Sequence, residues 1–554
     1  MSGEVPTDPA APDALPVAAE IAVPRWRRQL ATTVFRTNLY RAALRRGSGL
    51  TIAWTPPLVV PGSTTNANAM FQGRYTFAGH TVQSAKEAPW RLGDIAPSWL
   101  SRCHEFGWLA DFAAADGPTA RRHTRALIRR WIADFGRWSP LAWRPDILGM
   151  RLVSWLAHAD FLLVDAEPDF GETFLGLVGE HVRHLNNAQG MADTAAQRTI
   201  ARASYLTASL ALGRRLAQHE RHLQRLIACA IPVADGTATR RPSDLLRTLP
   251  PLLTLRDALR AGETSPPAEL DGIIDRMGSA LRLLTHGGEG LAVFHGGVEE
   301  DAETVATVVA RTAQIALPAT FGFARLEQGR LRVIAETAGP PPHDDGGFAS
   351  ALAMEVSIGK ERLFVNCGSP DGDDSDWQNA ARATAAHTAL IIDDRSQDCT
   401  DAAASQPDVL RGEEGDNVWL EITSNGYARA FGVHATRRYH MAKDGHELVC
   451  EERLDAHGAP QPGTRNPQEL CARYHLHPKI TASLLGDGHQ VLLRLGNGTG
   501  WVFEVADGTA RLEDSVYFGD AGKPRRTKQI VVTRAFSSRT AGFMWHLMRM
   551  DGRT

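Results

Sequence analysis

The sequence predicts a multidomain α+β protein, in which an N-terminal helical bundle or α/α toroid over residues 25–320 is followed by an antiparallel β-sandwich over residues 321–554. Two patterns support this division: apolar residues recur at helical spacing in the first half, and Asp-Gly or Asn-Gly turns separate short strand-like runs in the second. Helices followed by strands, without βαβ alternation, exclude a doubly wound fold. Residues 1–24 are rich in Pro, Ala and acid, and we expect a disordered lead-in.

Apolar stripes mark the helices of the first half. In 118–136, Leu127, Trp131 and Phe135 lie four residues apart, which places them on one helix face. Residues 50–100 contain several Pro and Gly and are expected to be irregular. Many consecutive helices joined by short loops are typical of a bundle or an α/α toroid. Further helices are expected at 147–164, 171–187, 194–214, 217–229, 243–260, 267–285 and 301–316.

Residues 25–46, RWRRQLATTVFRTNLYRAALRR, predict a basic amphipathic helix. We interpret its polar face as solvated, and a contact with a surface or partner is the alternative.

Four turn dipeptides divide the second half into strands. They lie between short runs rich in β-branched and aromatic residues, such as VLLRL and WVFEV. Such turns predict hairpins, and their number favours an antiparallel sandwich. The dipeptides are Asp444-Gly445, Asp487-Gly488, Asn497-Gly498 and Asp507-Gly508.

Composition narrows the function. The net charge of -3 and the absence of a long basic run give no indication of nucleic acid as a partner. The six Cys are scattered and are expected to be reduced thiols. The sequence contains no uninterrupted run of about 18 apolar residues, so we expect no transmembrane helix. The N-terminus lacks the basic and apolar regions of a signal peptide, so we expect a cytoplasmic protein.

Eight segments, in one order along residues 30–550, together resemble the heparinase II/III family of polysaccharide lyases, particularly its proteobacterial members. They are HEFGWLADF (104–112), WRPDILGMRLVSWL (143–156), HGGEGLAVFHGG (286–297), VNCGSP (365–370), RATAAHTAL (382–390), RYHLHP (473–478), SVYFG (515–519) and PRRTKQIVV (524–532).

The resemblance implies a substrate cleft between the toroid and the sandwich, an acidic polysaccharide or oligosaccharide as partner, and β-elimination next to a uronic acid. This chemistry needs a group that neutralises the uronate, a base that takes the C5 proton, and an acid that protonates the leaving oxygen. Members of the family often act in the cell envelope or periplasm, which is the alternative to a cytoplasmic location.

On the sandwich side, the resemblance points to His387 in RATAAHTAL as a catalytic residue or metal ligand, although a structural His is the alternative. Some family members hold zinc, and the corresponding ligands here would be His343, Asp345 and His387. His475 and His477 lie two apart on an expected strand, and Arg473 shares their parity, so all three should face one side. We assign His475 to catalysis, and Arg473 and His477 to substrate binding, with incidental strand residues as the alternative.

On the toroid side, the family's Asn-His or Asn-Arg pair aligns with Gln197 and Arg198, which we assign to substrate binding. Tyr205 lies seven residues after Arg198 and is the candidate catalytic Tyr, although core packing is the alternative. The family's Tyr-His pair is missing, because DGTATRRPSDLL (235–246) stands in its place. Arg240 and Arg241 in that segment are candidates for binding an acidic sugar, since a guanidinium matches a carboxylate.

Three functions follow from this sequence. The first is a polysaccharide-lyase-like enzyme. The second, favoured by the missing Tyr-His pair, is a catalytically impaired carbohydrate-binding or scaffolding protein of the same family. The third is a glycoside hydrolase, which would need two facing carboxylates that the sequence does not identify.

Overall fold

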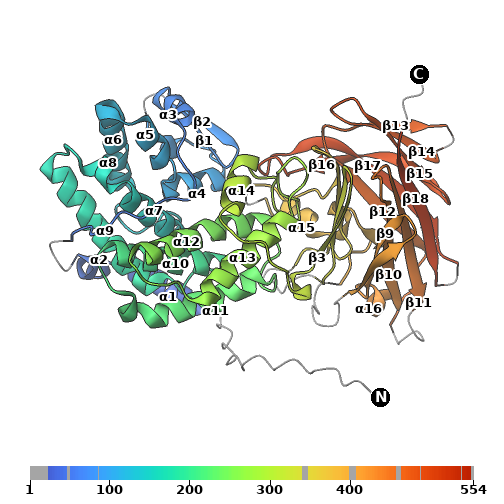
Figure 1. The fold of residues 1–554 in the computed structure, drawn as a ribbon, viewed down its shortest axis with the longest axis horizontal. Coiled ribbons are helices and arrows are strands. Elements are labelled where there is room, and N and C mark those ends of the chain that lie inside the picture. The colour runs from blue at the N-terminus through green and yellow to red at the C-terminus, as the bar shows by residue number, and fades with distance from the viewer. Residues whose placement is uncertain are drawn as a thin grey trace, which may run out of the picture.

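The computed structural model describes most of the chain in two halves, one helical and one built of strands (Figure 1). Residues 1–22 of the predicted lead-in lie outside the described residues, as do His343 and Asp345. The described ranges are 23–45, 50–84, 87–339, 347–372, 374–398, 407–456, 463–486, 488–537 and 539–550.

The first half is helical, as predicted. Its helices are α1 (Arg25–Phe35), α2 (Asn38–Leu44), α3 (Thr64–Phe71), α4 (Pro97–Glu105), α5 (Leu109–Ala115), α6 (Gly117–Phe135), α7 (Pro145–Ala157), α8 (Ala159–Leu163), α9 (Pro168–Ala188), α10 (Ala195–Ala211), α11 (Glu220–Ala234), α12 (Pro242–Ala261), α13 (Ala268–Leu283) and α14 (Ala302–Val309). Trp99, Trp131 and Trp155 are fully buried between them, so these rings fill the core.

Residues 50–100 are more ordered than expected. They contain α3, the hairpin of β1 (Arg74–Phe77) and β2 (His80–Gln83), and the start of α4. The Ser63 side chain accepts a hydrogen bond from the Asn66 amide and caps α3. Pro97 begins α4 at a position where its missing N–H costs nothing. The prediction of an irregular segment therefore holds for residues 50–62 but was wrong for residues 64–83, which form a helix and a hairpin.

The helices give way to strands between Val309 and Phe323. The strands are β3 (Phe323–Gln328), β4 (Leu331–Glu336), β5 (Met354–Ile358), β6 (Glu361–Val365), β7 (Leu390–Ile392), β8 (Asp408–Glu414), β9 (Asn417–Ser424), β10 (Val433–Ala442), β11 (Glu447–Ala456), β12 (Glu469–Leu476), β13 (Thr481–Leu485), β14 (Gln490–Arg494), β15 (Gly500–Val505), β16 (Thr509–Tyr517), β17 (Arg525–Ala535) and β18 (Ala541–Arg549). Two short helices, α15 (Ser375–Arg382) and α16 (Ala428–Phe431), interrupt them.

These strands form two antiparallel sheets, which confirms the predicted sandwich. One sheet has the order β13-β14-β15-β18-β11-β10-β9-β8. The other has the order β16-β17-β12-β6-β5-β4-β3, with β7 paired to β12. Alternate residues of facing strands are buried together, among them Leu454, Tyr474, Phe503 and Trp545.

The turn dipeptides behave as predicted with one exception. Asp444-Gly445 joins β10 to β11, and Asn497-Gly498 joins β14 to β15, each pair antiparallel. Strands β13 and β14 also pair, around Gly488. The turn at Asp507-Gly508 instead joins β15 in one sheet to β16 in the other, so the hairpin predicted there was wrong. An Asp-Gly dipeptide predicts a tight turn, but it does not predict whether the strands before and after the turn pair with each other.

A fully buried ion pair lies inside the sandwich. Arg437 on β10 donates from Nε to both oxygens of Glu452 on β11, each at 2.9 Å. Its Nη1 donates to the carbonyl oxygens of Leu352 at 2.5 Å and Thr388 at 2.9 Å. Tyr474 donates to Glu452 at 2.8 Å. The pair therefore ties one sheet to two loops of the other.

The segment between α13 and α14 fixes the helical half to the sandwich. His286 lies 2.8 Å from Glu355 and 2.9 Å from Ser357, both on β5. Farther along, Glu299 accepts hydrogen bonds from Tyr517 at 2.7 Å and from His477. Burial alone would raise the pKa of Glu299, but these donors lower it well below its ordinary value. The two halves are thus joined by buried polar contacts.

Candidate functional site

A cavity of about 180 Å³ lies at the junction of the two halves. It is lined by the first turns of α10 and α12, by the segment that precedes α12, by His295 of the junction segment, and by the loop before β5. The lining residues are Thr194, Ala196, Gln197, Ile200, Thr239, Arg240, Arg241, Asp244, Arg247, His295, Gly347 and Phe348. Three of the predicted substrate-binding residues, Gln197, Arg240 and Arg241, therefore meet at one place.

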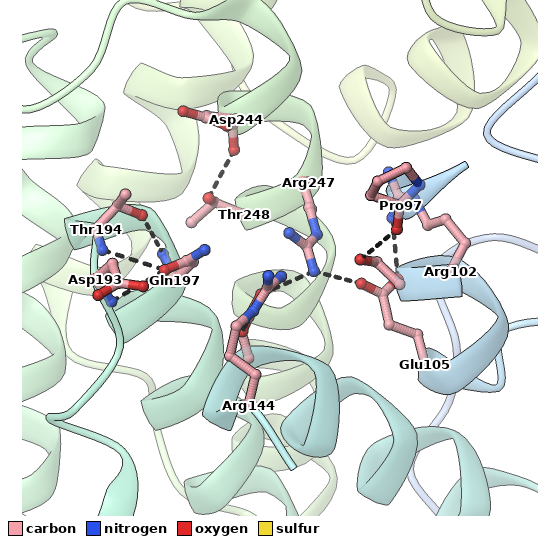
Figure 2. Close-up of polar contacts among 12 residues, drawn as sticks. Pro97, Arg102, Glu105, Arg144, Asp193, Thr194, Gln197, Asp244, Arg247 and Thr248 are labelled. Carbon is pink, nitrogen blue, oxygen red and sulfur yellow. Dashed lines mark hydrogen bonds and ion pairs between the residues drawn. The ribbon is translucent and has the colours of Figure 1, made fainter. Parts of the chain in front are cut away.

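A capping box fixes the side chain of Gln197. Thr194 caps α10 by accepting a hydrogen bond from the Gln197 amide, and Gln197 Oε1 accepts from the amides of Asp193 and Thr194 at 3.1 and 3.2 Å. Because the oxygen is held by two N–H donors, the side-chain NH₂ must be the outer group. In Figure 2 the end of Gln197 points away from Thr194, toward the side where Arg247 lies. Gln197 thus presents a donor to the cavity.

Arg240 and Arg241 are held differently. Arg240 is 3% exposed, donates to the Gly339 carbonyl, and has Nη1 3.7 Å from Glu336. Burial lowers the pKa of Arg240 from its ordinary value, and Glu336 partly opposes this shift. Arg241 is less buried and donates from Nε to the His295 carbonyl at 2.8 Å. Its terminal NH₂ groups make no hydrogen bond within the described part of the chain. Arg241 is therefore the better placed to contact a ligand.

Arg247 joins the cavity to a network of buried charges (Figure 2). Its Nη2 donates to Glu105 and, at 2.9 Å, to Asp146, which also pairs with Arg144 at 2.7 Å. Burial alone would lower the pKa of Arg247, but the carboxylates of Glu105 and Asp146 outweigh it and raise that pKa. Its charge is compensated by these partners, so Arg247 positions the first turn of α12 and adds little positive field to the cavity.

His295 and Phe348 form the wall on the sandwich side. His295 Nε2 lies 2.8 Å from Glu336 Oε1. His295 has φ of 52°, a left-handed conformation that non-Gly residues rarely adopt and that is concentrated at functional sites. The Phe348 ring stands between two imidazoles, with centroid distances of 5.8 Å to His295 and 6.0 Å to His387. An added Cβ at Gly296 would lie 2.8 Å from that ring, so Gly is required for this packing.

His387 lies behind Phe348 and does not line the cavity. Its side chain is 2% exposed, and neither ring nitrogen has a hydrogen-bond partner in the described residues. Burial, with the nearby His295 and His475, lowers the pKa of His387 to about 3, so the ring is neutral at pH 7.

Two candidates from the toroid, Arg198 and Tyr205, do not line the cavity. Arg198 donates from Nη1 to the carbonyls of Ala192 and Asp193, both at 3.1 Å, and so holds the loop that precedes α10. Tyr205 is 2% exposed and packs in the toroid core against His219 and His222, with ring centroids 5.6 and 4.8 Å away. The candidate catalytic Tyr therefore does not line the cavity, because Tyr205 lies about two helical turns beyond Arg198, away from the first turn of α10.

The three candidates near the end of β12 also lie outside the cavity lining. His475 is buried and bonds to Ser515 at 2.9 Å and to the Ala385 carbonyl at 3.0 Å. His477 contacts Glu299, and Arg473 pairs with Glu513 at 3.2 Å. Their shared parity is real, but each side chain already pairs with a neighbour outside the cavity. Their catalytic and binding roles stay predictions.

The zinc prediction depends on residues outside the described part of the chain. His343 and Asp345 fall there, and His387 is the remaining member of the set. Within the described ranges, no three His, Cys, Asp or Glu side chains are grouped so that they could hold a metal. His387 alone is not a zinc site, which usually needs three or four ligands. Zinc binding therefore stays a prediction.

The arrangement is suited to an anionic group. The N-terminal ends of α10 and α12 both reach the cavity, and the positive ends of the two helix dipoles favour a negative ligand. Gln197 and Arg241 add side-chain donors at the same place. Phe348 adds an aromatic surface on which a sugar ring can pack. One negative charge at the cavity disfavours an anionic ligand: the carboxylate of Asp244, which accepts a hydrogen bond from Thr239 at 2.9 Å.

Sequence reasoning missed His295, Arg247 and Phe348. His295 lies within HGGEGLAVFHGG, whose two His residues look alike in sequence, but His286 is buried at the domain junction and His295 reaches the cavity. Arg247 follows Asp244 by three residues, one helical turn, which is the signal that could have identified it. Phe348 follows a Gly pair in a loop and carries no comparable signal.

Comparison with known proteins relates this architecture to polysaccharide lyases. Residues 310–545 match the family model "Heparinase II/III-like, C-terminal". Heparinase III has the same fold with a TM-score of 0.65 at 12% identity, covering 95% of this chain and 90% of that one. A mutant of the heparan sulfate lyase HepC from Pedobacter heparinus gives 0.58 at 14% identity, covering 95% and 89%. At these identities the likeness establishes the fold alone.

A full-length relative is also known. FtsZ-localized protein C of Caulobacter vibrioides is 28% identical over 557 residues, covering 92% of each chain. The helical half followed by the sandwich is the fold that this chain shares with heparinase III and HepC. Residues 310–545, which form most of the sandwich half, are similar to the heparinase II/III-like C-terminal domain.

Proposed function

We propose that this protein binds an acidic saccharide in the cleft between its two halves and does not cleave it. The observation that carries this proposal is the composition of the cavity. Gln197 and Arg241 supply donors for a carboxylate or sulfate, and the dipoles of α10 and α12 add a positive potential there. The Tyr that would complete a lyase site lies in the toroid core, and the family's Tyr-His pair is replaced by Ser243 and Asp244.

Replacing Arg241 by Gln is expected to weaken binding of a uronic-acid oligosaccharide about tenfold to a hundredfold, because a charge-assisted hydrogen bond contributes about 1.5–3 kcal/mol. Isothermal titration calorimetry measures the change. Arg221→Gln, on the exposed face of α11, is the matched control and should bind like wild type. A neutral oligosaccharide of equal length should not bind. Equal affinity of wild type and Arg241→Gln would contradict the assignment.

A second candidate is a lyase, and His295 favours it. His295 lines the cavity with its Nε2 2.8 Å from the Glu336 carboxylate, and an imidazole at such a place can serve as a general base. In this case His295 would take the C5 proton while Gln197 and Arg241 neutralise the uronate. Release of unsaturated product, seen as a rise in ultraviolet absorbance and lost in His295→Gln, would establish this function over binding alone.

The relative named for its localisation with FtsZ covers nearly the whole of this chain. We propose that this protein also gathers where FtsZ assembles. A fluorescent fusion expressed in the native organism is expected to form a band that coincides with labelled FtsZ and disperses when FtsZ is depleted. A uniform distribution in dividing cells would contradict this proposal.

A further inference from the structure

Helix α1 carries an apolar stripe that faces away from the protein. Trp26, Leu30 and Val34 lie four residues apart, so they occupy one side of the helix. Their exposed fractions are 57%, 59% and 52%, and no residue of α1 is buried. Leu39, at the start of α2, is 80% exposed. Single exposed apolar residues are ordinary, but a stripe containing Trp on one short helix is not.

The opposite side of α1 fixes the helix to the toroid. Phe35 packs against Tyr40 and His184, with ring centroids 4.9 and 4.8 Å away. Arg28 pairs with Asp193, the residue before Thr194 of the cavity lining. These contacts fix one face of α1 against the protein and leave the apolar stripe exposed on the other face. Figure 1 shows the position of α1 in the helical half.

The same segment is strongly basic. Residues 25–46 contain seven Arg and no Asp or Glu, in a chain whose net charge is -3. Arg27 lies over the Trp26 ring at 5.1 Å, and Arg36 over Trp138 at 5.2 Å. Both residues are exposed, so they flank the stripe with positive charge. Cations around a Trp-containing apolar face match the headgroups and acyl boundary of an anionic bilayer.

We propose that α1 docks this protein on an anionic membrane surface. Trp26, Leu30 and Val34 enter the boundary between headgroups and acyl chains, while Arg27 and Arg36 contact lipid phosphates. This is binding in the plane of the membrane: among the described residues no helix is long and apolar enough to span a bilayer. The site is separate from the proposed saccharide cleft, and either proposal can fail alone.

The test is co-sedimentation of the full chain with vesicles. Wild type is expected to sediment with phosphatidylglycerol-containing vesicles and not with pure phosphatidylcholine, and raising the salt concentration should weaken binding. The triple variant Trp26→Ala, Leu30→Ala, Val34→Ala should bind these vesicles at least about tenfold more weakly than wild type. Arg27→Gln with Arg36→Gln should also lose affinity. Since these side chains are exposed, the variants should keep the wild-type melting temperature.

The matched control is Val409→Ala with Leu410→Ala on β8, which removes exposed apolar side chains from the other half of the protein. This control should bind vesicles like wild type. The proposal is overturned if wild type does not sediment with anionic vesicles, or if the α1 triple variant sediments equally well. It is also overturned if the triple variant changes the sedimentation coefficient of the free protein while vesicle binding is unaffected, because α1 would then contact a second copy.

Discussion

Replacing Glu452 by Gln is expected to lower the free energy of unfolding by about 3–5 kcal/mol, because the change leaves the Arg437 charge without its counter-ion. Both side chains are 0% exposed. Burial alone would lower the pKa of Arg437, but the Glu452 carboxylate and the phenols around it outweigh burial and raise that pKa well above its ordinary value, so Arg437 stays charged. Urea unfolding followed by circular dichroism measures the loss.

Two further variants make this prediction specific. Asp455→Asn removes an ion pair from the same strand, but Asp455 and Arg453 are 45% and 43% exposed, so the change should stay within about 0.5 kcal/mol. Replacing Arg437 and Glu452 together by Met removes both charges and should recover part of the stability; the carbonyls of Leu352 and Thr388, which lose their donor, limit the recovery. A loss below about 1 kcal/mol in Glu452→Gln would contradict the expected role of the buried pair.

The buried pair also affects the cleft. Arg437 holds the carbonyls of Leu352 and Thr388, which lie close in sequence to Phe348 and His387. Loss of its counter-ion should loosen both loops, so Glu452→Gln should also weaken saccharide binding although it is remote from the ligand.

The toroid is expected to lose stability steeply as the pH falls below about 6.5. Burial, with the positive charge of Arg151, lowers the pKa of His104 to about 3 and that of His181 well below its ordinary value. Burial lowers the pKa of His184 to about 3. Between about 6.5 and 3 the unfolded chain binds protons at these sites and the folded chain does not. Stability is therefore complete above about 6.5 and falls by about 1.4 kcal/mol per pH unit for each group.

Chemical unfolding at a series of pH values tests this expectation. His104→Gln keeps an acceptor for the Trp131 indole N–H, which donates to His104 at 3.0 Å, and should reduce the pH slope by about one proton. His446→Gln, at an exposed position, is the control and should leave the slope unchanged. A free energy of unfolding that is constant between pH 7 and 5 would contradict the account.

The fold could be predicted from the sequence because its signals are local and repeated. Helical apolar stripes and turn dipeptides each report on a few neighbouring residues, and their order gave the two halves. The errors arose where one residue type has two uses. Pro97 begins a helix where Pro was taken as a breaker, and Gly508 turns the chain into a second sheet where a hairpin was expected.

The site was only partly predictable because it is assembled from four segments distant in sequence. Gln197, Arg240 and Arg241 were found through the family's order of motifs, since helix starts keep their place in a toroid. His295 and Phe348 could not be placed, because nothing local tells which loop residues of the sandwich face the cleft. Tyr205 was misleading for a physical reason: residues seven apart share a helix face, but that face enters the core after the first turn.

The central claim, recognition without cleavage, is tested most directly by one titration. Each member of a panel of uronic-acid oligosaccharides is titrated into the protein. The heat of binding and the ultraviolet absorbance are measured on the same samples. We predict saturable binding of at least one acidic member, which Arg241→Gln weakens about tenfold to a hundredfold, with no increase in absorbance over many hours. A sustained rise in absorbance that depends on His295 would contradict the claim, as would the absence of binding by every member of the panel.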